Sequence, residues 1–579
     1  MENLEIARLL AETADLMEIA EEDGFRIRSY RNGASAIEGL GERVADILAD
    51  PKRKITDIPG IGKGLASVLA EIVERGSFGR RDELLERYPP TALEMLRIQG
   101  LGPKSIRVLW DHFRVSTLEE LERLCREGKL RDLPRMGAKL EEKILKGISH
   151  YRQGAGRFLL HFAAQAASEL VDYLGQTPGV ESVTPAGSLR RGRDTAGDLD
   201  LVVTGQNAAA ALDRFVAHPR VHDVLGHGSN KASARWGLEG LQVDVRAVPA
   251  ESYGAAMQYF TGSKEHNVAL RQRAQRMGLT LNEYGLFKID SEERVAGASE
   301  EEIYRALGLA WIPPEMRENQ GEIEAAEKGE LPDLLELAAM RGDLHMHTRE
   351  SDGRGTLEEM AAAAQALGYE YVAITDHSKA LAMANGLDEL RAVAFAAEVR
   401  EFNAQNPHFR VFSGLECDIL RDGKMDLSED ALAELDFVVA SVHSYMNLES
   451  AEMTDRLLRA LESPSVKVLG HPTGRVLLHR DAYAYDFDTI AREAAKRNIW
   501  MEINASPERL DLHATLIRRA KELGCKFTIS TDAHHPKHLA NMRFGVTMAR
   551  RGWLTAADVM NTRSRAAFAE AIGAGGPRG

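Results

Sequence analysis

The sequence lacks the features of a secreted or membrane-inserted protein. Its three cysteines, Cys125, Cys417 and Cys525, cannot form a disulfide framework in 579 residues, and a reducing compartment fits them best. No apolar run approaches the roughly 20 residues that span a bilayer. The first residues are acidic where a secretion signal would be basic. We therefore expect a cytoplasmic protein.

An excess of positive charge is also absent. The chain has 73 Lys+Arg against 88 Asp+Glu, a formal net charge of -15. This balance excludes a protein that coats nucleic acid through bulk positive charge, so any nucleic-acid binding must come from local geometry. The content of 44% hydrophobic and 28% charged residues is ordinary for a chain that buries apolar cores. At roughly 100 to 200 residues per domain, the length predicts several domains.

The predicted helices and strands change in pattern along the chain. Short amphipathic helices broken by glycine-bearing turns come first, followed by a long helix with alternating strands. After a polar, acidic segment, seven short apolar strands alternate with helical stretches. The predicted regions are two helical domains at 1–85 and 86–150, an α/β domain at 151–250, a smaller α+β unit at 251–318, a linker at 319–340 and a parallel β/α barrel at 341–579.

Three aspartates in the α/β domain form a candidate metal site. Asp198 and Asp200 alternate along one predicted strand, so their carboxylates share a face, and Asp244 lies on another predicted strand. Clustered carboxylates repel one another, so the arrangement is tolerable mainly where cations neutralise it. Two Mg²⁺ or Mn²⁺ ions held in this way can activate a 3′ hydroxyl and stabilise a departing pyrophosphate.

The segment GSLRRGRDTAGDLDLVV at 187–203 resembles the nucleotidyltransferase signature of the family X DNA polymerases, the DNA polymerase beta group. YFTGSKEHN at 259–267 resembles that family's nucleotide-binding turn, and LNEYGLF at 281–287 resembles a downstream motif. The resemblance implies an α/β nucleotidyltransferase palm at 151–250 and an α+β fingers-like nascent-base-pair domain at 251–318. It implies metal binding and catalysis by Asp198, Asp200 and Asp244, and nucleotide binding by Gly187, Ser188, Arg191, Gly197, Tyr259, Phe260, Gly262 and Asn267.

Three positions depart from the family's pattern. Gln242 stands where animal members carry Arg, and Lys264 stands where Asp is common, so we expect altered nucleotide binding with the same reaction class. Val68 occupies the position of the family's Schiff-base lysine, and the nearby Lys63 lies on the hairpin. We therefore expect little or no lyase activity of the family's kind.

Glycine-rich hairpins in the first 150 residues are candidate DNA-binding elements. IPGIGKG at 58–64 and IQGLGPK at 98–104 are typical of the helix-hairpin-helix motif, and LPRMGAK at 133–139 is a degenerate copy. Backbone N–H groups at such a hairpin can hold a DNA phosphate without reading sequence. The resemblance implies an 8-kDa-like domain at 1–85 and a thumb-like domain at 86–150. The candidate DNA-binding residues are Gly60, Gly62, Gly64, Gly100, Gly102 and Lys104.

Eleven of the 18 histidines follow residue 341, and most of them end predicted strands, which is the catalytic rim of a β/α barrel. Together with nearby carboxylates, these histidines give nine candidate nitrogen and oxygen ligands. A single ion takes about four to six ligands, so two or three metal ions are implied. Mn²⁺, Zn²⁺ or Fe²⁺ suits a donor set of histidine and carboxylate. The succession HMH, TDHS, GLE, SVH, GHP and TDAHH resembles the polymerase-and-histidinol-phosphatase (PHP) domain, which implies a distorted (β/α)7 barrel and an active metal-dependent phosphoesterase. The predicted ligands are His345, His347, Asp352, His377, Glu416, His443, His471, Asp532 and His534.

Together these resemblances identify the chain as similar to bacterial family X DNA polymerases with a C-terminal PHP domain. They imply gap filling in DNA repair, including base excision repair, and a 3′→5′ exonuclease that processes DNA ends. Abasic-site endonuclease and 3′-phosphatase activities remain open for the barrel. The implied partners are gapped or nicked duplex DNA, deoxynucleoside triphosphates and other DNA repair proteins, and the implied location is the bacterial cytoplasm at the nucleoid.

Three alternatives remain open from the residues alone. The first is a template-independent nucleotidyltransferase, which the hairpins disfavour because they are double-strand DNA devices. The second is a DNA-end tether with idle catalytic centres. The third is a PHP domain that acts on small phosphomonoesters.

Overall fold

The computed structural model describes residues 3–38, 44–58, 60–89, 91–96, 98, 101–133, 136–154, 156–237 and 239–574. The chain divides into two compact units. One comprises Met1–Ala155 with Leu478–Arg480, and the other comprises Gly156–Leu477 with Asp481–Gly579. Among the described residues, no helix combines the length and apolarity that crossing a bilayer requires.

The first unit is helical, as the sequence predicts, and its helices pack around one apolar core. They are α1 (Asn3–Ile19), α2 (Gly24–Glu38), α3 (Val44–Ala49), α4 (Lys63–Arg75), α5 (Gly79–Arg87), α6 (Thr91–Leu96), α7 (Pro103–Phe113), α8 (Leu118–Arg126) and α9 (Ala138–Gly154). In α4, Leu65, Leu69 and Ile72 recur at helical spacing and are buried. Gly62 and Gly102 are the N-cap residues of α4 and α7, so each of the two hairpins leads directly into a helix.

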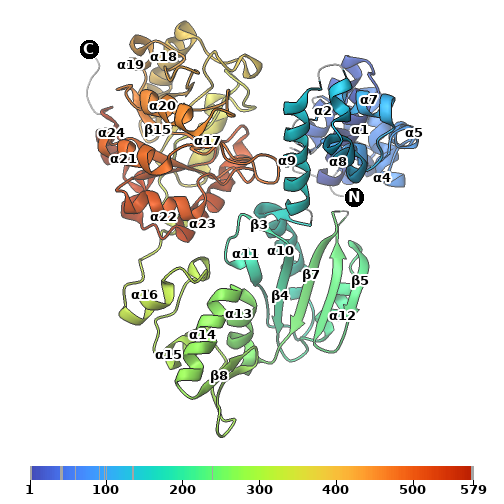
Figure 1. The fold of residues 1–579 in the computed structure, drawn as a ribbon, viewed down its shortest axis with the longest axis vertical. Coiled ribbons are helices and arrows are strands. Elements are labelled where there is room, and N and C mark those ends of the chain that lie inside the picture. The colour runs from blue at the N-terminus through green and yellow to red at the C-terminus, as the bar shows by residue number, and fades with distance from the viewer. Residues whose placement is uncertain are drawn as a thin grey trace. The chain divides into compact units, whose positions relative to one another are not determined.

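The second unit begins with a five-stranded palm sheet in the order β2-β4-β7-β6-β5 (Figure 1). Leu199, Leu201 and Val203 of β4 pack in a core with α10 and α12, while Asp198 is exposed at the start of the strand. The elements are β1 (Phe158–Leu159), α10 (Leu160–Gly175), β2 (Ser182–Pro185), α11 (Gly187–Arg190), β3 (Thr195–Ala196), β4 (Asp198–Thr204), α12 (Ala210–Val216), β5 (Val221–His227), β6 (Lys231–Trp236) and β7 (Leu241–Ala247).

The fingers-like region combines helices with a small antiparallel sheet in the order β10-β9-β8. A buried ionic network joins this region to the palm. The Glu300 carboxylate accepts from Arg317, at 2.6 and 3.1 Å, and from Arg190 of α11, at 2.8 Å to each oxygen. The elements are α13 (Tyr253–Thr261), α14 (Lys264–Arg276), β8 (Leu279–Asn282), β9 (Gly285–Lys288), β10 (Arg294–Ala296) and α15 (Glu300–Ala306).

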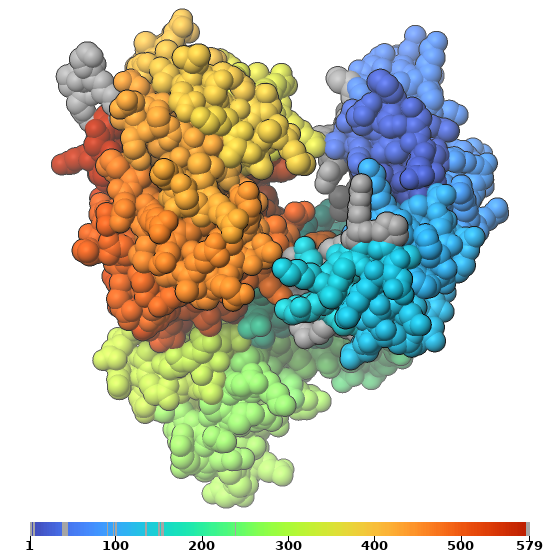
Figure 2. All heavy atoms as spheres, turned by 45° about the horizontal axis from the view of Figure 1, so that its top comes forward, coloured from blue at the N-terminus to red at the C-terminus, as the bar shows by residue number. Residues whose placement is uncertain are grey.

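The segment 319–340, predicted as a linker, is packed against its neighbours and contains α16 (Glu322–Lys328). Ile323 and Leu334 belong to the core of the fingers-like region, whereas Leu335 and Met340 belong to the core of the barrel. Figure 2 shows this yellow-green segment against the orange-red C-terminal part of the chain. The connection therefore shares buried side chains with the regions on both of its sides.

The C-terminal region is a seven-stranded parallel sheet in sequential order, which confirms the predicted barrel. A parallel bridge between Met346 and Ala533 joins the segments that follow the first and last strands. The strands are β11 (Gly342–Asp343), β12 (Tyr371–Ile374), β13 (Arg410–Asp418), β14 (Phe437–Ser441), β15 (Val466–Leu469), β16 (Trp500–Asn504) and β17 (Phe527–Ser530). The helices are α17 (Leu357–Ala366), α18 (Glu389–Gln405), α19 (Glu429–Ala433), α20 (Ser450–Ala460), α21 (Phe487–Arg497), α22 (Ala514–Glu522), α23 (Met542–Arg551) and α24 (Arg565–Ile572).

Palm and barrel contact each other inside the second unit. Leu160 of α10 is buried in the barrel's main core cluster, and Leu189 of α11 packs against the same cluster. Nη1 of Arg475 donates to Oδ2 of Asp194 at 3.1 Å, and Nη1 of Arg551 donates to the backbone carbonyl of Arg191 at 2.6 Å.

Candidate active sites

The three aspartates of the palm lie together on two neighbouring strands. β4 pairs in parallel with β7, with Asp200 opposite Asp244 and Asp198 opposite Gln242. Because side chains two positions apart on a strand share a face, all three carboxylates face the same side of the sheet. Leu199, between the first two, is buried in the core on the other side. The structure thus brings the predicted triad together.

The electrostatics of the triad suit a divalent cation. Burial and the neighbouring carboxylates of Asp198 and Asp244 raise the pKa of Asp200 to about 7. Burial also opposes ionisation of Asp244, but hydrogen bonds from Lys231 and Ser233 lower the pKa of that carboxyl. A cation among the three groups would remove the repulsion that holds the pKa of Asp200 high. Since all the donors are carboxylate oxygens, the residues fit Mg²⁺ or Mn²⁺.

The start of α11 approaches the triad closely. Gly187 has φ +61°, and a Cβ there would lie 2.7 Å from Oδ2 of Asp200, so only glycine fits without a shift. The hydroxyl of Ser188 is buried and makes no hydrogen bond with the described part of the protein. Gly197 directly precedes the strand, and the nearest atom to a Cβ there would be Nη1 of Arg157, at 3.8 Å. A ligand bound at the start of α11 could therefore form a hydrogen bond with the Ser188 hydroxyl.

Arg191 and Gly262, both predicted to bind nucleotide, lie beside each other. Nη1 of Arg191 donates to the carbonyl of Thr261, and Nε donates to Oε1 of Glu318 at 3.1 Å. Gly262 has φ +68°, and a Cβ there would lie 3.1 Å from Nη1 of Arg191. The two bonds of Arg191 use two of the five N–H donors of its guanidinium, so Arg191 retains donors for a phosphate.

The remaining nucleotide-binding candidates form a contact cluster on α13 and α14. The ring of Tyr259 packs edge-on against that of Phe260, and the Arg246 guanidinium lies over the Phe260 ring, 4.2 Å from its centroid. The Asn267 amide is engaged inside the protein, because Oδ1 accepts from Gln258 at 2.6 Å and Nδ2 donates to the Tyr259 carbonyl at 2.7 Å. These bonds leave one N–H and one oxygen lone pair of the amide for the predicted contact of Asn267 with a nascent pair.

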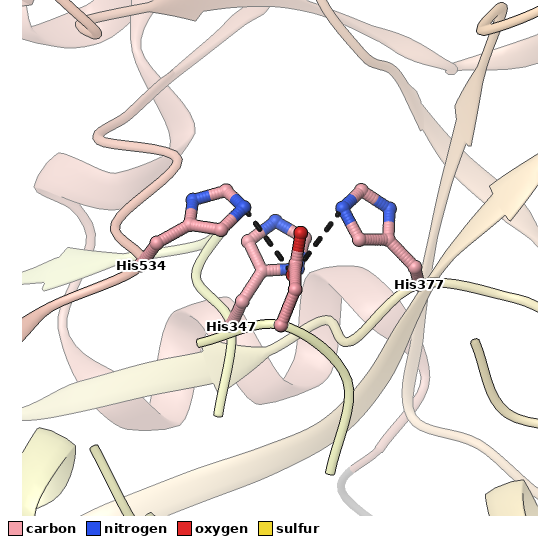
Figure 3. Close-up of side chains that lie close together, drawn as sticks. His347, His377 and His534 are labelled. Carbon is pink, nitrogen blue, oxygen red and sulfur yellow. Dashed lines mark ion pairs between the residues drawn. The ribbon is translucent and has the colours of Figure 1, made fainter. Parts of the chain in front are cut away.

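The nine predicted barrel ligands converge beyond the carboxyl ends of the strands. His471, the one predicted ligand outside the three groups given below, contacts Glu416, with its Nε2 2.8 Å from Oε1 of that residue. Figure 3 shows His347, His377 and His534 with their imidazoles directed toward a common point. Three groups have ligand atoms that all lie within 4.8 Å of one another: His347 with Asp352, His377 and His534; His345 with His347 and Asp532; and His377 with Glu416 and His443.

Several of these ligand atoms make no hydrogen bond to the described residues although they lie close to one another, as metal-binding atoms do: Oε2 of Glu416 is 2.8 Å from Nδ1 of His377 and 3.5 Å from Nε2 of His345. Nε2 of His345, Nδ1 of His347 and Oε2 of Glu416 are buried and accept or donate no hydrogen bond within the described residues. Burial, with the neighbouring His534 and His377, lowers the pKa of His347 to about 3, so its imidazole is neutral and can donate a lone pair. The residues therefore fit a centre of two or three divalent metals.

Sequence reasoning missed the carboxylates that orient the histidine ligands. Glu502 of β16 lies 2.7 Å from Nδ1 of His345 and accepts from the backbone N–H of His471 at 2.5 Å. Asp418 lies 3.1 Å from Nδ1 of His443. Such partners fix the ring orientation and the tautomer of a metal-binding histidine. A signal was available, because Asp418 stands two residues after Glu416 and so shares its face of β13.

The hairpin glycines lie in the first unit, and Gly100 falls outside the described residues. Gly60 has φ +90°, in the left-handed region that favours glycine. A Cβ at Gly62, Gly64 or Gly102 would meet nothing within 4 Å, so packing inside the protein does not require glycine at those three positions. Lys104 is exposed on α7. Val68 is half-buried on α4, and Lys63 begins that helix.

A palm with three clustered carboxylates, joined to a barrel with a cluster of histidines and carboxylates that could hold metal ions, is the arrangement of an enzyme with two sites for phosphorus chemistry. Family models match at residues 1–78 (helix-hairpin-helix domain), 92–149 (SAM-like helix-hairpin-helix tandem), 256–318 (DNA polymerase beta thumb) and 343–506 (PHP domain). The region predicted as fingers-like thus matches the model described as a thumb.

Full-length similarity places the chain more narrowly. It is 36% identical over 565 residues to the DNA polymerase/3′-5′ exonuclease PolX of Bacillus subtilis, covering 97% of this chain and 98% of that protein. DNA polymerase lambda of Rattus norvegicus is 24% identical over 326 residues, 51% of this chain and 53% of that protein. A probable phosphatase of Photobacterium profundum is 31% identical over 209 residues, 34% of this chain and 80% of that protein. The crystal structure of a ternary P/T complex of Leishmania infantum polymerase beta matches 39% of this chain and 99% of that chain, with 23% identity and a TM-score of 0.27. The chain belongs to the bacterial family X DNA polymerases that carry a C-terminal PHP domain, which confirms the family predicted from the sequence.

Proposed function

We propose that the chain fills short gaps in DNA with its palm and trims 3′ ends with its barrel. One observation carries the polymerase assignment: three carboxylates share one face of two parallel strands, in a chain that aligns over 97% of its length with a DNA polymerase/3′-5′ exonuclease. The intact set of nine converging ligands supports the second activity. Gapped or nicked duplex DNA and deoxynucleoside triphosphates are the substrates, and other DNA repair proteins are partners near the nucleoid.

In the palm, the chain's own residues position the reactants. Asp198, Asp200 and Asp244 hold Mg²⁺ or Mn²⁺, which supplies charge stabilisation for the primer 3′ hydroxyl and the departing pyrophosphate. The free hydroxyl of Ser188 donates to a triphosphate oxygen. Arg191 donates to the same triphosphate with the N–H donors that its bond to Glu318 leaves free.

In the barrel, buried residues hold the ligand rings in place and restrict the solvent around a phosphodiester. His345 is oriented by Glu502 and His443 by Asp418, so both rings keep one nitrogen directed at the centre. The metals that the nine ligands fit supply Lewis acidity at the scissile phosphate. The identity of those ions is part of this proposal, with Mn²⁺, Zn²⁺ or Fe²⁺ favoured by the mixed donor set.

The helix-hairpin-helix elements hold the DNA backbone. Glycine at 62, 64 and 102 is not required by internal packing, and it is explained by a phosphate that approaches the backbone N–H groups closely. Exposed Lys104 adds a cation at the second hairpin. This mode is independent of sequence and agrees with the chain's negative net charge.

The test is a primer-extension and degradation assay on one-nucleotide-gapped duplex with Mn²⁺. Asp198→Ala/Asp200→Ala should lose extension and keep 3′ degradation, whereas His345→Ala/His347→Ala should lose degradation and keep extension. Single-stranded primer serves as the control for untemplated addition. Degradation that survives the histidine changes would contradict the assignment of the barrel.

A second candidate activity is hydrolysis of small phosphomonoesters by the barrel. The 31% identity with a probable phosphatase favours it. Phosphate release from a nucleotide or sugar phosphate, with no degradation of DNA ends by the same preparation, would identify that activity in place of the exonuclease.

A further inference from the structure

Arg509 is a cationic side chain beside the barrel centre that has no assigned role. It lies in the segment between β16 and α22, and its Nε is 3.7 Å from Oδ2 of Asp532. The other oxygen of that carboxylate lies 3.1 Å from Nε2 of His347. Arg509 is therefore adjacent to the ligand atoms of the proposed metal centre.

The guanidinium of Arg509 retains unused hydrogen-bonding capacity. Its side chain is 20% exposed, yet Nη1 is buried and has no partner among the described residues. At 3.7 Å the contact with Asp532 is too long for a hydrogen bond. A buried charged donor without a hydrogen-bond partner costs free energy. The unpartnered Nη1 is explained if a bound ligand accepts a hydrogen bond from it.

The backbone around Arg509 is held in place by Arg475. Nε of Arg475 donates to the Arg509 carbonyl at 3.0 Å, and Nη2 donates to the Leu510 carbonyl. Farther along, the Asp511 carboxylate accepts from the backbone N–H of Thr473 at 3.0 and 3.3 Å. These bonds tie the segment to the loop after β15, so the backbone that carries Arg509 is held in place before any ligand arrives.

We propose that Arg509 binds a non-bridging oxygen of the scissile phosphate at the barrel centre. The planar guanidinium matches phosphate geometry, and its place against Asp532 puts an anion held by the metals within its reach. This assignment rests on the proposed phosphodiesterase function of the barrel. A rival role is purely structural, in which Arg509 only balances the charge of Asp532 and so preserves the metal site.

The experiment compares full-length, Mn²⁺-loaded wild type with Arg509→Gln and Arg509→Lys. Arg492→Gln, on the outer face of α21 with a side chain 58% exposed, is the matched control. Inorganic phosphate is the probe, and its dissociation constant is measured by titration calorimetry beside the bound-metal content and the kcat and KM for 3′ degradation. We expect phosphate to bind about 10- to 100-fold more weakly to Arg509→Gln, with an intermediate loss for Arg509→Lys and no change for Arg492→Gln. Metal content and gap filling should stay at the wild-type level.

Three other outcomes would overturn the proposed role of Arg509, and they differ in what they say about the barrel. An unchanged phosphate affinity in Arg509→Gln, with wild type active on DNA ends, overturns the role of Arg509 and leaves the exonuclease proposal standing. Loss of bound metal in Arg509→Gln assigns the residue the structural role and also overturns the inference. Wild type that neither binds phosphate nor degrades DNA ends removes the proposed barrel function itself, and the role of Arg509 with it.

Discussion

The ionic network around Glu300 leads to a prediction on stability that can be worked through in numbers. Glu300 is 6% exposed and Arg317 is fully buried, and Arg190 joins them from the palm. Although burial opposes ionisation, the two guanidinium groups lower the pKa of Glu300 from its ordinary 4.5 to about 2. At about 1.4 kcal/mol per pKa unit, this corresponds to about 3 kcal/mol of stabilisation at neutral pH. Glu300→Gln, which leaves Arg317 without its carboxylate, should cost about the same, within the range of about 3 to 5 kcal/mol for breaking buried pairs.

The sign of the pH dependence follows from the lowered pKa. Because the folded protein binds a proton at Glu300 less readily than the unfolded chain does, the stabilisation is fully present above about pH 5. It is lost as the pH falls from 4.5 toward 2. The difference between wild type and Glu300→Gln should therefore be constant from about pH 7 to about pH 5 and should shrink below that range.

Hydrogen exchange followed by mass spectrometry gives the local free energy of opening without assuming a single unfolding step. The peptides to follow are those covering α13 to α15. Glu301→Gln, an exposed position in the first turn of α15, is the control and should cost less than about 1 kcal/mol. A loss below about 1 kcal/mol in Glu300→Gln, or a difference that does not shrink below about pH 5, would refute the reasoning.

Two further predictions concern metal binding and DNA binding. Glu502→Gln should lower metal affinity at the barrel about 10- to 100-fold, because His345 loses its orienting carboxylate. Gap filling should stay intact. Metal titration of the full chain measures the affinity, and an unchanged value would contradict the prediction. Gly64→Ala should raise the stability of the first unit by about 0.5 to 1 kcal/mol, since the added methyl has free space in α4, yet it should weaken binding to gapped duplex. Urea unfolding and a DNA titration measure the two effects, and tighter or equal DNA binding would count against phosphate contact at this hairpin.

Much of the fold could be predicted because the strands that carry the chemistry have strong local signals. Alternating Asp198, Leu199 and Asp200 fix which face of β4 carries the carboxylates, and histidines at strand ends predict the barrel rim. The packing of 319–340 was not predicted, because Ile323, Leu334 and Leu335 stand in an acidic stretch that also contains Pro332 and so is typical of a linker. Only the two neighbouring cores show why these residues are apolar.

The candidate sites also contain residues that the sequence predicts and residues that it does not. The residues expected to touch metal or nucleotide were found through short motifs, whereas their supporting partners are distant in sequence. Glu300 lies 110 residues from Arg190, and Glu502 lies 157 residues from His345. No local pattern encodes such pairs. Arg509 was missed for a related reason, since a lone arginine in a loop has no periodicity to distinguish it.

The contact between palm and barrel bears on how the chain can be cut into parts. Leu160 and Leu189 belong to the palm by sequence but pack with the barrel's core. A fragment ending before residue 341 would expose these leucines to water and leave Asp194 without Arg475. The polymerase half is thus not a detachable module, and fragments expressed alone would need polar replacements on this surface to remain monodisperse.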